Sequence, residues 1–208
     1  MKKIIVIILL LVGWHHFYHV SSAPSVGAGM LSGGLPFVNT PDKTTFRIND
    51  YSYNPVKAME LDARVLDASH YYFDKMSRIS PTDLVLGWRE LSNESTINQL
   101  DFNITDRSYE WDNPNKVISD AFIKANTKLV HTIPGNDLVK QQLKSIRIGD
   151  VIFARGYLVN VKSASGLSWK TASKNNSTSR TGITKKTTQG DLFFIDELEV
   201  IDALSRVY

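Results

Sequence analysis

Residues 149–162 read Gly-Asp-Val-Ile-Phe-Ala-Arg-Gly-Tyr-Leu-Val-Asn-Val-Lys. From Val151 onward apolar and polar residues roughly alternate, and many of the apolar ones are β-branched or aromatic, which is typical of a half-buried strand. Gly149 and Asp150 form the turn that leads into this strand. Because a glycine inside a strand commonly marks a bulge or a bend, Gly156 predicts that the strand is curved.

Further strands are predicted on both sides of this one. Alternating patterns at residues 46–53 and 59–66 predict two strands before it. After it, residues 167–172 can form a short partner strand across the Ser165–Gly166 turn, and residues 191–201 form a last strand. Most of the predicted β structure therefore lies late in the chain.

Three helices are predicted between the early and late strands. Apolar residues recur at three- and four-residue spacing in residues 115–126, after Pro114. Asn136 can cap a second helix, which ends before Gly149. A Ser-Pro-Thr-Asp turn at residues 80–83 predicts the start of a short third helix, because proline is tolerated in the first helical turn.

Together these elements predict a mixed α+β domain. A Gly-Asp turn that enters a strand with an internal glycine is similar to the device with which small barrels bend a strand around a closed sheet. We therefore expect a small curled sheet or an OB/SH3-like barrel with two or three short helices. This analogy concerns the fold and implies no function.

The N-terminus has the features of an export signal. Lys2 and Lys3 precede an apolar run from Ile4 to Gly13, and no further formal charge occurs before Asp42. One interpretation is a cleaved signal peptide, with cuts between Ala23 and Gly29. The other is a retained anchor, because the helix can continue through aromatic residues suited to the membrane interface, up to about Val20.

We favour the retained anchor. Residues 1–23 are then a signal-anchor segment with a transmembrane helix, residues 24–45 a flexible linker rich in Gly, Ser, Ala and Pro, and residues 46–208 an extracytoplasmic domain. Because Lys2 and Lys3 stay on the inner side, the expected location is the inner (plasma) membrane, crossed once. The N-terminal helix makes the membrane itself a predicted partner.

Composition excludes several kinds of site. The chain has 208 residues, of which 42% are hydrophobic and 22% charged, so it can bury one core. It has no cysteine, which rules out disulfides, thiolate metal sites and cysteine nucleophiles. The formal net charge of +3 is too small to indicate a nucleic-acid partner. His15, His16 and His19 share a helix face, but no nearby carboxylate would orient them, and no metal or cofactor is predicted.

A basic segment is the sharpest local feature of the sequence. Between Val151 and Gly190 there is no Asp or Glu. The candidate anion-binding residues in this segment are Lys174, Arg180, Lys185 and Lys186. They can contact lipid head groups, a polyanionic envelope polymer or an acidic partner surface, or they can form only a solvated hairpin tip. Nucleic acid is not expected, because Trp169 alone is available for base stacking.

Candidate catalytic residues are few and follow no known motif spacing. His131, His70 and Asp83 can act together only if the fold brings them into one cleft. Each has an alternative structural role, since a histidine is often a hydrogen-bonded core residue and Asp83 can stabilise a helix start. The sequence contains neither a Gly-x-Ser-x-Gly motif nor a His-Glu-x-x-His motif.

Several motifs resemble those of an uncharacterised family of short bacterial proteins with one N-terminal membrane segment. The main match is the Gly-Asp-Val motif at residues 149–151, followed by the Gly-x-Leu-Val motif at 156–159. Further matches are Ala63-Arg64-Val65-Leu66, Tyr71-Tyr72, Ser80-Pro81-Thr82-Asp83-Leu84, Gly87-Trp88 and His131-Thr132-Ile133-Pro134.

The resemblance covers most of the chain after Phe46 and implies an anchored location. The chain departs from the family after Trp169, where many relatives carry a tighter segment that ends in a cysteine-containing strand. Here a longer basic loop without cysteine follows.

The predicted function is that of a single-pass envelope protein whose domain binds or scaffolds without catalysis, with an envelope protein or an anionic surface as partner. Two alternatives remain. One is a hydrolase that uses His131, His70 and Asp83 in a cleft. The other is a secreted or periplasmic soluble binding protein, released by signal cleavage.

Overall fold

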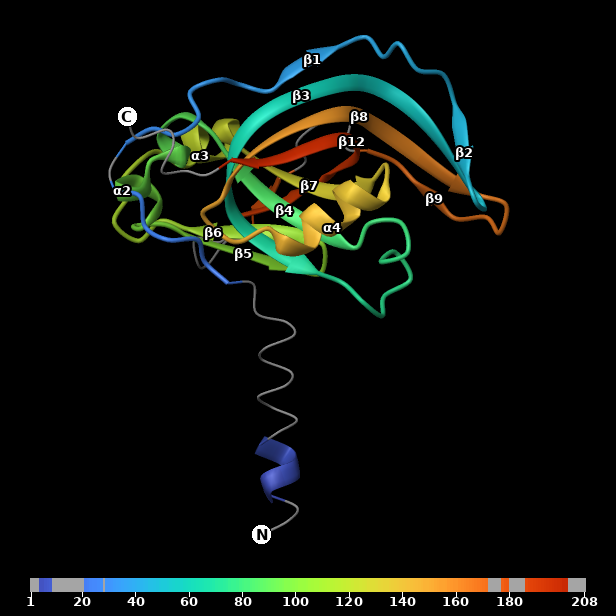
Figure 1. The fold of residues 1–208 in the computed structure, drawn as a ribbon. Coiled ribbons are helices and arrows are strands. Elements are labelled where there is room, and N and C mark those ends of the chain that lie inside the picture. Colours follow the sequence, from blue (N-terminus) through green and yellow to red (C-terminus); the bar gives the residue numbers. More distant parts are fainter. Residues whose placement is uncertain (1–3, 9–20, 28, 172–176, 180–185, 202–208) are drawn as a thin grey trace.

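The computed structural model describes residues 4–8, 21–27, 29–171, 177–179 and 186–201. It shows a mixed α+β arrangement of a large curled sheet, a smaller sheet and a few short helices (Figure 1). The large sheet consists, in spatial order, of β1 (Phe37–Asn39), β3 (Tyr51–His70), β4 (Thr82–Gly87), β7 (Thr127–Pro134), β12 (Asp191–Ile201), β8 (Val151–Ser163) and β9 (Ser168–Trp169). The remaining strand, β2 (Phe46–Ile48), pairs with β3.

The large sheet closes on itself because β3 pairs with two different neighbours. The 20 residues of β3 make it the longest strand. Its first two thirds pair with β8, from Tyr51 opposite Ser163 to Arg64 opposite Val151, and its end pairs with β4. Register shifts, which bend and twist a strand, occur in β3 after Pro55 and after Val65. The two strands predicted at 46–53 and 59–66 are thus a short hairpin and one long, bent strand.

Gly156 lies where the closure is tightest. It pairs with Met59 of β3 on one side and with Ile195 of β12 on the other. A Cβ atom at this position would lie only 2.0 Å from the backbone oxygen of Phe194. Next to this contact β12 shifts register between Ile195 and Glu197. The absence of a side chain at Gly156 therefore lets the two strands approach, and the register shift beside it lies in β12 and not at Gly156 itself.

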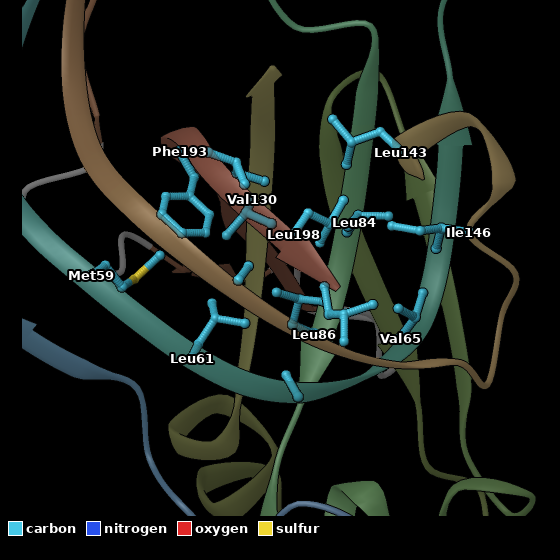
Figure 2. Close-up of a cluster of buried hydrophobic side chains, with 14 of the residues drawn as sticks. Met59, Leu61, Val65, Leu84, Leu86, Val130, Leu143, Ile146, Phe193 and Leu198 are labelled. Atoms are coloured by element: carbon cyan, nitrogen blue, oxygen red, sulfur yellow. The ribbon is translucent and has the colours of Figure 1, made fainter. Parts of the chain in front are cut away.

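A hydrophobic core fills the inside of the curled sheet (Figure 2). The strands contribute Met59, Leu61, Val65, Leu84, Leu86, Val130, Phe193 and Leu198, among others. One side is covered by helix α4 (Asp137–Ser145), which contributes Val139 and Leu143. The side chain of Asn136 accepts a hydrogen bond from the backbone of Val139, so the predicted cap is present. Fully burying a side chain such as Leu143 stabilises the fold by about 1.5–3 kcal/mol.

A second layer covers the outer face of β4 and β7. It consists of the smaller sheet, in the order β10 (Ser177–Ser179), β11 (Lys186–Gln189), β6 (Ser108–Asp112) and β5 (Asp101–Thr105), and the short helices η1 (Arg89–Ser92), α2 (Glu94–Ile97) and α3 (Asp120–Asn126). Alternate residues of the barrel strands point outward, so Val85 and Leu129 pack against Tyr109, Trp111 and Ile123 of this layer.

Two helix predictions require correction. No helix follows Pro81: residues 82–87 are strand β4, in which every residue is buried. A strand buried on both faces loses the alternating pattern, so its sequence gave no strand signal. The helix predicted from residue 115 begins only at Asp120, where the Ser119 side chain accepts a hydrogen bond from Phe122. Residues 115–118 instead follow a turn held by the side chain of Asn113, which accepts from the backbone of Val117.

The segment before β1 contacts the domain closely. The backbone of Ala23 donates to the oxygen of Ile148 over 2.6 Å, and Ile148 donates to Ser21 over 3.0 Å. Leu31 is buried, with 6% of its surface exposed. Part of the predicted linker at residues 24–45 therefore lies against the domain, which the chain reaches at Ser21.

Glu94 receives this N-terminal segment. Its carboxylate accepts hydrogen bonds from the Ser25 hydroxyl and the Val26 backbone, and it forms a buried ion pair with Arg64 over 3.2 Å. Desolvation by burial acts to raise the pKa of Glu94, but these hydrogen bonds and the Arg64 charge outweigh it and lower the pKa. The docked segment thus favours the charged form of Glu94.

Within the part of the chain that the structure describes, no helix has the length and apolar character needed to cross a bilayer. Residues 4–8 are helical. The second half of the apolar run that predicts the anchor, residues 9–13, lies outside the described residues, as do His15, His16 and His19.

Candidate functional site

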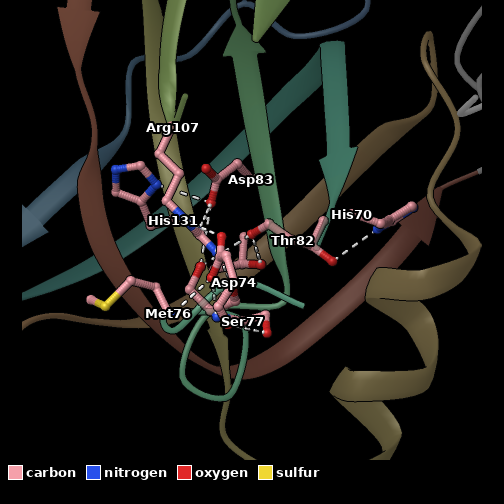
Figure 3. A network of polar contacts seen from close by, with 10 residues as sticks. His70, Asp74, Met76, Ser77, Thr82, Asp83, Arg107 and His131 are labelled. Atoms are coloured by element: carbon pink, nitrogen blue, oxygen red, sulfur yellow. Dashed lines mark hydrogen bonds and ion pairs between the residues drawn. The ribbon is translucent and has the colours of Figure 1, made fainter. Parts of the chain in front are cut away.

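A polar cluster is centred on Arg107, on the outer face of the large sheet (Figure 3). Arg107 lies in the turn between β5 and β6. Asp106 and Arg107 have φ angles of 50° and 57°, the left-handed conformation that a two-residue hairpin turn of type I′ requires. The turn directs the guanidinium group toward the large sheet, where it contacts strand β4 and the loop between β3 and β4.

Asp83 is the buried partner of Arg107. No part of its surface is exposed, and its Oδ1 lies 3.1 Å from Arg107 Nη1 and 2.9 Å from His131 Nδ1. The Ser80 hydroxyl donates to the same oxygen over 3.3 Å. A buried carboxylate is tolerated only where opposite charge and hydrogen bonds compensate its desolvation. The surrounding groups compensate Oδ1 of Asp83 on strand β4, whereas Oδ2 is buried and has no hydrogen-bond partner among the described residues.

The guanidinium group also holds the loop between β3 and β4, residues 71–81. Arg107 donates from Nε and Nη2 to Asp74 Oδ2 over 2.9 and 2.7 Å, and Nη2 donates to the Ser80 backbone oxygen over 3.0 Å. Its Cζ atom lies 3.9 Å from the ring centre of Tyr71. Burial, followed by the nearby charge of Asp83, raises the pKa of Tyr71, so this phenol stays protonated and neutral. Arg107 thus joins the β5–β6 hairpin to this loop and to β4.

The side chain of His131 is buried inside the protein. Only 2% of its surface is exposed, and its ring lies 5.0 Å from that of Trp169. A Cβ atom on Gly190 would lie 2.7 Å from Nε2, which shows how closely the backbone packs on this nitrogen. A general base needs its nitrogen within hydrogen-bond reach of a substrate. The packing leaves no such space at His131.

His70 lies on the other side of β4. Its Nδ1 is 3.0 Å from the hydroxyl of Thr82, which neighbours Asp83 in the strand. Successive side chains of a strand point to opposite faces, so His70 and Thr82 are separated from Asp83 and His131 by the backbone of β4 (Figure 3). Burial, and then the charge of Lys144, lower the pKa of His70. The fold therefore brings His131 and Asp83 together and keeps His70 apart from them.

An open groove lies elsewhere, between the N-terminal strand β1 and the outer surface of β3, β8 and β12. Its volume is about 760 Å³. Four carboxylates line it, from Asp42, Glu60, Asp196 and Glu197, and Arg155 is the cation among its lining residues. Arg155 pairs with Glu197. The groove thus presents an acidic surface to solvent.

Asp42 and Lys43 attach the segment after β1 to the residues on the opposite side of this groove. The Tyr157 hydroxyl donates to Asp42 Oδ1 over 2.7 Å, and this bond raises the pKa of Tyr157 to about 12 and lowers that of Asp42. Lys43 Nζ lies 3.3 Å from Asp196 Oδ2 and 4.9 Å from the ring centre of Phe46. Exposed ion pairs contribute little each, but a lysine over aromatic rings gains additional attraction.

The predicted anion-binding residues can be located only in part. Lys174, Arg180 and Lys185 lie outside the described residues. Lys186 is the first residue of β11, and its backbone pairs opposite Trp111 of β6. Some of the basic segment therefore extends the sheet that covers the barrel. Among the residues for which the structure gives positions, no cluster of His, Asp and Glu has the arrangement of a metal site.

Arg107 is not among the site residues predicted from the sequence. Its partners Asp83 and Asp74 are 24 and 33 residues away in sequence, so no local spacing indicates the cluster. The available signal was the hairpin itself, in which Phe102 and Ile104 alternate before a polar two-residue turn, and Tyr109 and Trp111 alternate after it.

No protein-family model, curated protein or solved structure matches this chain.

Proposed function

We propose that the protein is a single-pass, membrane-anchored envelope protein whose extracytoplasmic domain is an OB-type barrel used for non-enzymatic binding or scaffolding. The observation that carries the binding role is the contrast between two sites. The candidate catalytic pair His131–Asp83 is buried under the β5–β6 hairpin, whereas the acidic groove is open to solvent. Catalysis needs converging groups at an accessible concave site, and binding needs only the concave site.

Five strands close the large sheet into a ring, and their order supports an OB-type barrel. We call them the ring strands: β3, β4, β7, β12 and β8. Numbered along the chain, β3, β4, β7, β8 and β12 follow one another around the ring as 1-2-3-5-4-1. The third and fifth of them, β7 and β12, pair in parallel. Helix α4 lies between the third and fourth strands. This is the Greek-key order of OB barrels, which bind ligands on the second and third strands and the adjoining loops.

That usual binding face is covered in this protein. Val85 and Leu129, from the second and third ring strands, are buried beneath the smaller sheet. A ligand would therefore bind elsewhere on the domain, and the groove beside β1 supplies a surface of suitable size. Two of its four carboxylates, Asp196 and Glu197, are paired with Lys43 and Arg155, and the remaining excess of negative charge favours a cationic segment of a partner protein over an anionic polymer.

The anchor is supported by the N-terminal sequence together with the place where the domain begins. Two lysines and an apolar run precede residue 14, and backbone hydrogen bonds already fix Ser21 and Ala23 to the domain. Few residues thus separate the apolar run from folded structure. A helix retained in the membrane would hold the barrel close to the bilayer surface.

Thiol labelling tests the proposed side of the membrane, because the chain has no cysteine of its own. Asn39→Cys places one thiol on exposed strand β1, at the groove. In spheroplasts, a membrane-impermeant maleimide should label this variant as fully as it does after detergent lysis. The unsubstituted chain gives the background, and a cytoplasmic thiol protein reports leakage. Labelling that requires lysis would contradict the proposal.

A further inference from the structure

The loop between β3 and β4 exposes two adjacent aromatic side chains. Phe73 has 89% of its surface exposed and Tyr72 has 50%. Their ring centres lie 6.4 Å apart. Large aromatic residues are normally buried in part, so an exposed pair at the tip of a loop indicates contact with something apolar.

This loop is held in a defined conformation from within. Asp74 accepts hydrogen bonds from the backbones of Met76 and Ser77, each over 2.6 Å. Ile79 is buried in a hydrophobic cluster with Ile133 and Phe194, and Arg107 binds Asp74 from the neighbouring hairpin. The inner side of the loop is thus fixed to the barrel (Figure 3). Because ordering costs little when a loop is already fixed, the exposed tip is preorganised for contact.

Positive charge accompanies the aromatic tip. Lys75 and Arg78 are both exposed, within five residues of Phe73. The nearby acidic group, Asp74, is neutralised by Arg107. Lys144 on helix α4 lies close enough to lower the pKa of His70, the residue before the loop. Aromatic rings flanked by lysine and arginine are the combination that favours the interface of an anionic bilayer.

The loop also lies on the appropriate side of the domain. The chain reaches the domain at Ser21, which pairs with Ile148 just after helix α4. In Figure 1 residues 21–27 and the β3–β4 loop lie on the lower side of the domain, whereas β1 lies at the top. A bilayer reached through the N-terminal segment would therefore face the loop.

We propose that the Tyr72–Phe73 tip is a second membrane contact. The two rings enter the boundary between head groups and acyl chains, while Lys75 and Arg78 contact anionic lipid phosphates. Together with the N-terminal helix, this contact fixes the orientation of the barrel, and it leaves the acidic groove facing away from the bilayer. The inference rests on the proposed membrane anchor. It also gives the Arg107 cluster a role, which is to hold the loop in its contact geometry.

Fluorescence quenching in proteoliposomes tests this contact with the full-length chain. Phe73→Cys is labelled with a small environment-sensitive fluorophore, and the protein is reconstituted into phosphatidylcholine–phosphatidylglycerol vesicles with and without doxyl-labelled lipid. The matched control carries the same label at Asn39→Cys on the opposite side. We expect at least twofold stronger quenching by doxyl lipid at position 73 than at position 39. Adding K75Q and R78Q should reduce that difference.

The outcomes separate the two proposals. The protein can stay in the vesicles through an alkaline wash while its label at position 73 is quenched no more than the label at position 39. This result would overturn the loop contact and leave the anchor standing. Protein that the wash releases from the vesicles overturns the anchor and, with it, this inference. Matching thermal unfolding of the labelled and unsubstituted chains shows that the label, on a largely exposed side chain, has not disturbed the fold.

Discussion

Replacing Arg107 with methionine is expected to lower the free energy of unfolding by about 3–5 kcal/mol, because it leaves a buried carboxylate without its main cation. Asp83 has no exposed surface, and the methionine would keep much of the apolar packing of the arginine stem while removing all of its hydrogen bonds. Urea unfolding of the full-length protein in detergent measures the change. Arg78→Met, at an exposed position of the β3–β4 loop, is the matched control and should change stability by less than about 0.5 kcal/mol.

A double-mutant cycle makes this prediction specific to the pair. If Asp83→Asn is combined with Arg107→Met, the buried charge disappears together with its partner, so the double variant should be more stable than the sum of the two single changes implies. Additive effects, or an Arg107→Met variant as stable as Arg78→Met, would show that the cluster does not compensate the charge of Asp83.

Replacing Gly156 with valine should destabilise the domain by about 3 kcal/mol or more, at or beyond the upper end of the usual cost of overpacking. The first added carbon would lie 2.0 Å from the backbone oxygen of Phe194. That oxygen belongs to a strand of the ring and cannot move without disturbing the pairing of β12 with β8. Thermal unfolding of the full-length chain measures the effect.

Gly34→Val is the matched control, because a Cβ atom at Gly34 meets nothing within 4 Å. If Gly156→Val does not fold, Gly156→Ala places the same first carbon against Phe194 with less added bulk. Unfolding temperatures equal to that of Gly34→Val for both Gly156 variants would contradict the tight closure between β8 and β12.

The parts of the fold that sequence predicted are those with strong local patterns. Residues 191–201 form a strand with the predicted limits, and α4 follows its predicted cap at Asn136. Gly156 indicated a bend because its effect is local. Strand β4 was missed because it is buried on both faces, so neither period appears in its sequence. The single strand β3 was divided into two predictions where its register shifts interrupt the alternation.

The candidate site was less predictable, for a physical reason. His131 and Asp83 meet because they are opposite one another in the pairing of β4 with β7, two strands that are far apart in the sequence. Arg107 reaches them from a hairpin inserted between the second and third ring strands. Such contacts are set by packing between distant segments, and a single sequence carries no local signal for them.

Fractionation of the expressed full-length protein tests the central claim, membrane anchoring, most directly. Membranes are washed with alkaline carbonate, and the intact mass of the retained protein is measured. We expect the protein to stay in the membrane pellet at its full-length mass. Release of a soluble species whose N-terminus is cut between Ala23 and Gly29 would contradict the anchor and would make the domain a secreted or periplasmic binding protein.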